Sequence, residues 1–154
     1  MDYILKYLTH LLPVLTLMVA IGVAGLAYQQ YQLGRAKLKL DLFEKRLLVF
    51  NETQKLLNAN VTDKPEGLER VYQFRIATSQ SPFLFDSDII DLLEEIDNRS
   101  VDHLAIVQRM DSPSSDSHLD SLIDKNAHAE TWFKDQLRDL NFKFGPYLNL
   151  RAWR

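Results

Sequence analysis

Three aspartates that are close together in the sequence could form a metal-binding site. Asp86, Asp88 and Asp91 lie within six residues, and carboxylates at such short spacing are the ligands that Ca²⁺ prefers. The segment has neither the turn glycine nor the closing glutamate of an EF-hand loop. Asp86 or Ser87 as a helix N-cap, followed by acidic residues that suit the positive end of the helix dipole, explains the cluster without a metal. We therefore predict no metal site.

Other residue types that carry catalysis are scattered or absent. The four histidines are His10, His103, His118 and His128. They form neither an H-E-x-x-H motif nor a pair four residues apart. We expect His103 at the edge of a helix face and the other three in polar settings. The sequence has no cysteine, no G-x-S-x-G, and too few glycines for a phosphate-binding or dinucleotide loop. It predicts no enzymatic activity and no cofactor.

Length and composition limit the class of protein. The chain has 154 residues, of which 46% are apolar and 25% are charged. This suits one domain, or a small domain with an appendage, and excludes a disordered chain. The formal net charge of −3 gives no indication of a nucleic-acid partner.

A long uncharged segment near the N-terminus predicts a membrane helix. No charged residue occurs in positions 7–34, and positions 11–28 are almost continuously apolar. About 20 apolar residues cross a bilayer as a helix, so we predict a transmembrane span over residues 11–30. Residues 1–34 would form the N-terminal segment and residues 35–154 a helical domain. A signal peptide that loses its first 27 residues is the alternative, although its basic region would be weak and its apolar run unusually long.

Basic residues are distributed unevenly around this span. Lys6 precedes it, whereas five basic residues follow it closely: Arg35, Lys37, Lys39, Lys45 and Arg46. Cytoplasmic flanks are rich in lysine and arginine. We therefore predict a single-pass protein of the bacterial inner membrane, with its N-terminus outside and its C-terminal domain in the cytoplasm.

The apolar pattern continues beyond the span as a helix. Leucine, alanine and phenylalanine recur at alternating steps of three and four from position 33 to position 57, which predicts one continuous helix over residues 11–57. Its expected core face consists of Leu40, Phe43, Leu47, Phe50 and Leu57. A parallel coiled-coil dimer and a helical bundle both use such a face. A second apolar row, formed by Leu42, Val49 and Leu56, favours the bundle, because a two-stranded coil would leave that row exposed.

The rest of the chain predicts three further helices. They cover about residues 68–79, 86–110 and 119–140, and polar loops lie at 58–67 and 111–117. No alternating pattern indicates a strand. The predicted fold class is all-α, with about four helices in a bundle. Two acidic stretches, 86–102 and 111–130, are either solvated helix faces or docking surfaces for a basic partner.

The C-terminal tail combines aromatic and basic residues. Phe144, Tyr147 and Trp153 alternate with cationic side chains, and we expect Gly145–Pro146 to end the preceding helix. Aromatic rings with basic ends suit a bilayer interface. We therefore predict that this tail returns to the membrane-proximal end and packs on the first helix. A cap on the distal end of the bundle is the alternative.

Residues 37–47, with the sequence KLKLDLFEKRL, carry a resemblance to a known group of proteins. They resemble a family of small uncharacterised bacterial single-pass inner-membrane proteins, in which K-L-x-L-D-L-[FY]-[DE]-K-R follows the span. Further matches are Phe83-Leu84-Phe85, Asp88-Ile89-Ile90, the helix at 93–96 and the segment 144–148. The resemblance implies a bacterial inner-membrane protein and brings no activity, cofactor or catalytic residue with it.

Two functions are compatible with these observations. The first is a membrane-anchored module for protein–protein interaction, as a subunit of a bacterial membrane assembly. Its partners would be the lipid bilayer and either another protein or further copies of this chain, bound through the long first helix or the acidic helices. The second is a membrane-acting effector or accessory protein of a toxin–antitoxin or phage-defence system.

Overall fold

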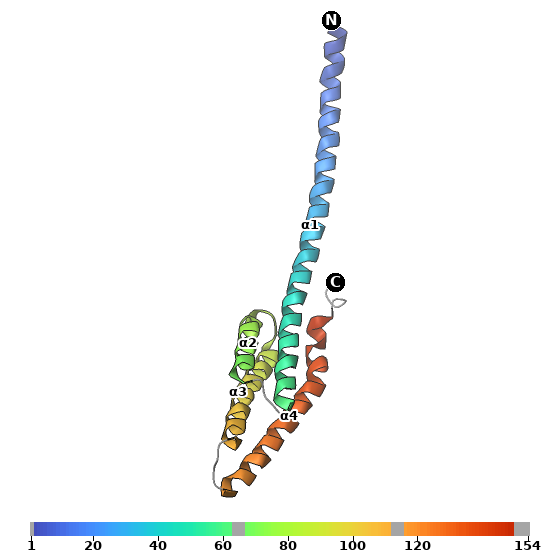
Figure 1. Ribbon diagram of the computed structural model, residues 1–154. Helices are drawn as coiled ribbons and strands as arrows, with labels where there is room; N and C mark the ends of the chain where they lie inside the picture. The colour runs from blue at the N-terminus through green and yellow to red at the C-terminus, as the bar shows by residue number, and fades with distance from the viewer. Residues whose placement is uncertain (1, 63–66, 112–115, 150–154) are drawn as a thin grey trace. The chain divides into compact units, whose positions relative to one another are not determined.

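The computed structural model describes residues 2–62, 67–111 and 116–149, and the side chains of 2–12, 14 and 116–118 lie outside this description. Helices account for nearly all of it (Figure 1). They are α1 (Asp2–Val61), α2 (Leu68–Thr78), a short 3₁₀ helix η1 (Ser81–Phe83), α3 (Ser87–Met110) and α4 (Asp116–Leu148). The predicted all-α class with four helices is confirmed.

The chain divides into two compact units, Met1–Asp41 and Leu42–Arg154. The division falls inside α1, seven residues later than the predicted boundary after residue 34. In the first unit, the described side chains of α1 are almost all exposed. Among the residues that the structure describes, no helix is long and apolar enough to cross a membrane. Leu11, Leu12 and Val14, at the start of the predicted span, are among the residues whose side chains are not described.

The second unit is a small helical bundle formed by the C-terminal part of α1 with α2, η1, α3 and α4. α3 packs against α2, η1 and α4, and Figure 1 shows α2 beside α3. Its buried residues recur every three or four positions from Ile89 through Ile96 to Leu104, the spacing of one helix face. The other α-helices contribute Val49, Leu56, Leu57, Val71, Phe74, Phe133, Leu140 and Phe144 to the core, and the segment between η1 and α3 contributes Leu84 and Phe85. Each of the four α-helices therefore supplies apolar residues to one common core.

The end of α4 differs from the sequence-based expectation. Gly145–Pro146 was expected to end the helix, but α4 continues to Leu148 with Pro146 inside it. A proline removes one N–H and crowds the carbonyl four residues earlier, which here belongs to the exposed residue Phe142. So close to the helix end only one backbone bond is lost, and the full burial of Phe144 offsets that loss.

Two phenylalanines of α4 give a matched test of this core. Phe144 is 0% exposed and Phe142 is 86% exposed. Phe144→Ala should lower the free energy of unfolding by about 3–5 kcal/mol, as expected for removing a buried ring. Phe142→Ala should change it by no more than about 0.5 kcal/mol. Urea unfolding of the purified chain, followed by circular dichroism, measures both values. Equal effects from the two variants would contradict the packing of α4 described here.

Candidate functional site

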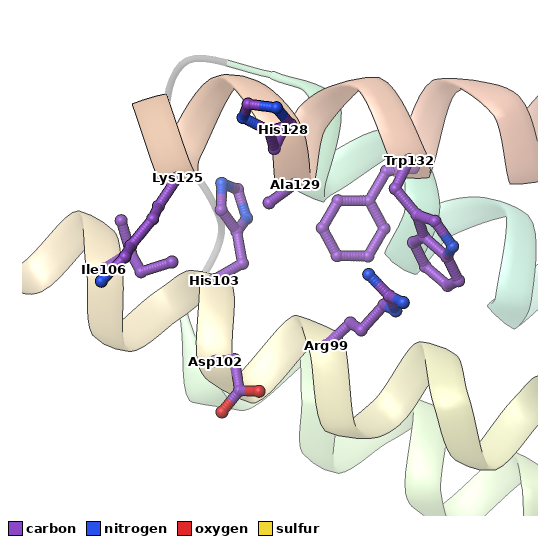
Figure 2. A pocket seen from close by; sticks show the side chains of 9 residues that line it. Arg99, Asp102, His103, Ile106, Lys125, His128, Ala129 and Trp132 are labelled. Carbon is purple, nitrogen blue, oxygen red and sulfur yellow. The ribbon is translucent and has the colours of Figure 1, made fainter. Parts of the chain in front are cut away.

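The interface of α3 and α4 contains a pocket of about 290 Å³. Figure 2 shows His103 pointing from α3 toward α4, Arg99 extending to Trp132, and Asp102 directed away from α4. Ile106, Ala129 and Phe133 form apolar walls, and Lys125 and His128 contribute polar groups. The guanidinium carbon of Arg99 lies 4.3 Å from the centre of the Trp132 ring, a cation–π contact that fixes one rim of the pocket. The pocket is suited to recognition through apolar walls and cations.

His103 is buried in a chain of polar side chains that joins three helices. It is 2% exposed, so the expected place at the edge of a helix face is wrong. Its Nδ1 lies 3.0 Å from the amide oxygen of Asn60 on α1, and its Nε2 lies 2.9 Å from the amide oxygen of Asn126 on α4. Buried polar groups need such partners because leaving them unpaired costs about 1–3 kcal/mol each.

Neighbouring acceptors fix the orientation of both asparagine amides. The Asn60 amide nitrogen donates to the backbone carbonyl of Leu56 at 2.9 Å and to the Ser100 hydroxyl at 2.9 Å. The Asn126 amide nitrogen donates to the Glu130 carboxylate at 2.8 Å. Both amide oxygens are thus turned toward the His103 ring. A protonated ring donates to both oxygens, whereas a neutral ring has one N–H and satisfies only one of them.

Two opposing effects act on the protonation of His103. Burial disfavours the charged ring and lowers its pKa below the ordinary value. The hydrogen bond to Asn126 and the charge of Glu130 act in the opposite direction and offset only part of that effect. His103 is therefore neutral near neutral pH. Although a protonated ring could donate to both amide oxygens, burial of its charge costs more than the second hydrogen bond gains, so acid lowers the stability of the folded chain.

This shift predicts how stability depends on pH. Between the lowered pKa and the ordinary histidine value of about 6.5, the unfolded chain binds the proton more readily than the folded chain does. The contribution of His103 is then complete above about pH 6.5 and declines as the pH falls toward its folded-state pKa. His103→Gln should flatten the decline in melting temperature between about pH 7 and pH 5. His128→Gln, at an exposed site, should leave the decline unchanged, and a decline of the same steepness in His103→Gln would contradict the prediction.

A second polar cluster, the Arg46 cluster, joins residues from three segments of the chain, 37–47, 83–85 and 144–148. Nε of Arg46 donates to the Leu84 carbonyl at 2.9 Å, and a terminal nitrogen donates to the Tyr147 carbonyl at 3.4 Å. The Arg46 guanidinium also lies 5.9 Å from the Phe85 ring centre and 5.5 Å from that of Tyr147. The KR end of the 37–47 motif thus contacts both the 83–85 segment and the 144–148 segment.

Asp86 belongs to this cluster as well. It occupies the N-cap position of α3, but its side chain makes no capping bond. It accepts a hydrogen bond from the Tyr147 hydroxyl at 2.8 Å instead. Burial is the main cause, and Asp86 a further one, of a raised Tyr147 pKa. Within the described parts of the chain, no three His, Asp or Glu side chains are grouped as metal ligands would be.

The five basic residues after the predicted span occupy different environments. Arg35 is exposed, with its guanidinium 5.8 Å from the Tyr31 ring centre. Lys37 is exposed and Lys39 is half-buried. Lys45 donates to the Gln80 side chain at 3.2 Å. Arg46 is half-buried and donates to two backbone carbonyls of the bundle.

The residues expected on the core face of the first helix differ in how deeply they are buried. Leu57 is fully buried, Phe50 packs on the core, and Phe43 and Leu47 are half-buried. Leu40, which belongs to the first unit, is 51% exposed. In the second apolar row, formed by Leu42, Val49 and Leu56, the last two residues are almost completely buried in the core.

The tail residues contact the first helix where the structure describes them. The Phe144 ring lies 5.6 Å from Phe50 of α1 and 5.4 Å from Phe85, and the Tyr147 ring lies 5.2 Å from Phe85. Phe144 is thus a core residue, and Tyr147 belongs to the Arg46 cluster. Trp153, the third residue expected in an interfacial tail, lies outside the described residues.

Comparison with known proteins adds no relative. No family model, curated protein or solved structure matches the chain. Any statement about its function therefore depends on the residues described above.

The sequence does not predict the network of His103 with Asn60 and Asn126, although it contains one indication of it. Asn126 stands seven residues before Phe133, and Asn60 stands three residues after Leu57. Each asparagine therefore occupies a core-facing position of its helix, where a polar residue needs a buried partner. His103 lies on the buried face of α3 one residue before Leu104. Three polar residues on core faces of three helices predict a network, but only the packing shows that they meet.

Proposed function

We propose that the chain is a membrane-anchored interaction module of the bacterial inner membrane, in which α1 is the anchor and the second unit is the interaction domain. One observation carries this proposal. Within the first unit, α1 presents large apolar side chains around most of its circumference, and mainly alanine occupies the remaining sector. The large side chains are Leu15, Leu17, Met18, Val19, Ile21, Val23 and Leu26, and each is more than half exposed. A helix that is apolar on all sides is stable only in an apolar environment, and a bilayer provides one.

Features at the end of the apolar segment support the same proposal. Tyr28 and Tyr31 are exposed where charged residues begin, the place at which aromatic rings favour a membrane interface. The Tyr28 hydroxyl accepts a hydrogen bond from Gln32 at 2.9 Å, and Arg35 covers the Tyr31 ring. Along α1, apolar residues are thus followed by aromatic and then basic residues. This order matches the hydrocarbon core, the interface and the cytoplasmic side of a bilayer. The resemblance of residues 37–47 to inner-membrane proteins agrees with this order.

The second unit supports the interaction role. Its α3–α4 pocket has apolar walls and cationic rims and contains no arrangement of nucleophile and base among the described residues. α2 adds an exposed apolar row of Leu68, Tyr72 and Ile76. A surface of this kind is suited to binding.

Membrane extraction tests the anchor. The full chain expressed in bacteria should stay in the membrane pellet after an alkaline carbonate wash. Ile21→Arg combined with Val23→Arg should release it, because each arginine near the bilayer centre costs about 2.5–3.5 kcal/mol on the insertion scale. Leu38→Arg, outside the proposed span, is the matched control and should remain in the pellet. Release of the unmodified chain by carbonate would refute the anchor.

A reporter fusion tests the orientation. A reporter joined after Arg154 should be active only in its cytoplasmic form, since five basic residues follow the span and one precedes it. Replacing Arg35, Lys37 and Lys39 by glutamine while adding three lysines before Tyr3 should shift activity toward the periplasmic form. Periplasmic activity of the unmodified fusion would contradict the orientation. Detection of a mature chain that lacks residues 1–27 would favour the signal peptide.

A further inference from the structure

α1 carries a row of aliphatic side chains at strict seven-residue spacing in the first unit. The row consists of Val19, Leu26, Leu33 and Leu40, and every member is at least 51% exposed. Residues seven apart on an α-helix point within about 20° of one direction. The four side chains therefore form one narrow stripe, which we call the leucine row.

A bilayer does not cover the whole leucine row. Leu33 and Leu40 lie beyond the proposed span of residues 11–30, and the basic residues Arg35, Lys37 and Lys39 lie between them in the sequence. Leu33 is 70% exposed. A leucine in this position is in contact with water unless another helix packs on it.

The fold of the second unit makes pairing of α1 with a second α1 compatible with the second apolar row. A two-stranded coil would leave the row of Leu42, Val49 and Leu56 uncovered. Val49 and Leu56 are at most 1% exposed, because α1 contributes them to the core of the bundle. The two rows thus have separate roles, and the leucine row of the first unit is left for a partner.

We propose that the leucine row is the seam of a parallel dimer, in which α1 of one copy packs on α1 of a second copy. Three observations support this occupant. A twofold pair needs only one self-complementary row, and the chain supplies it. With the leucine row at the a positions of a heptad, the d positions are Gly22, Gln29, Ala36 and Phe43. The small residues Gly22 and Ala36 allow close approach, and a glutamine in a membrane helix can hydrogen-bond across the pair. Lys39 then falls at g and Glu44 at e, and these positions face each other across a parallel pair with opposite charges.

The proposal deepens the proposed function and rests on it for its parallel direction. Copies inserted into a bilayer with the same topology are parallel, so identical residues meet across the seam. The experiments nevertheless distinguish failure of the anchor proposal from failure of the seam proposal. A chain that stays in the membrane without pairing would refute the seam alone, and a chain that pairs after release by carbonate would refute the anchor alone.

Disulfide trapping tests the seam directly, because the sequence has no cysteine of its own. Leu33→Cys and Leu40→Cys, each as a single substitution in the full chain, should give mostly covalent dimer when native membranes are oxidised. Leu38→Cys is the matched control, since Leu38 is 65% exposed and lies on the opposite side of the helix, five residues after Leu33. It should give several-fold less dimer. Little dimer from the first two chains, or as much from Leu38→Cys, would overturn the proposal.

A charge exchange tests the register of the pair. In the Leu40→Cys chain, Lys39→Glu places like charges opposite Glu44 of the second copy and should reduce the dimer several-fold. Adding Glu44→Lys restores opposite charges and should restore the yield. If Lys39→Glu leaves the yield unchanged, or the exchange does not restore it, the parallel register proposed here is wrong.

Discussion

The bundle depends on one row of side chains along α4. Asn126, Phe133, Leu140 and Tyr147 follow each other at seven-residue spacing, and Phe133 and Leu140 are at most 2% exposed. Since a helix presents such a row on one side, burying the two middle residues also determines where the two end residues lie. At one end Asn126 meets His103, and at the other Tyr147 meets Arg46 and Asp86. Both polar clusters of the unit are consequences of this apolar contact.

The His103 network and the Arg46 cluster hold the bundle together in different ways. His103 is neutral and buried, and its partners are amides whose orientation is fixed by further acceptors. Arg46 is only half-buried, and its guanidinium lies over two aromatic rings. One end of the α4 row is therefore held by a buried network of amides and an imidazole, and the other by an arginine that contacts aromatic rings and backbone carbonyls.

Helix periodicity was enough to predict the all-α class and to place α2 and α3 to within a few residues. It failed at the end of α4, where Pro146 was expected to stop the helix. Proline lowers helix propensity, but near a terminus the burial of Phe144 outweighs that loss. Helix periodicity also misplaced His103. Its contacts with Asn60 and Asn126 depend on how α1, α3 and α4 pack side by side. The division of α1 between an exposed leucine row and a buried row likewise depends on which neighbours pack on it.

The hydrogen bond between Arg46 and Tyr147 has a consequence for biosynthesis. Its partners are 101 residues apart in the sequence. The ring contact between Phe50 and Phe144 likewise joins residues far apart in the sequence. A ribosome adding about 5–20 residues per second needs roughly 5–20 s to synthesise the chain between them. During that interval the apolar faces of α1 and α3 are synthesised before the α4 row that completes their core. These apolar faces therefore remain without their α4 partner until the last helix has left the ribosome.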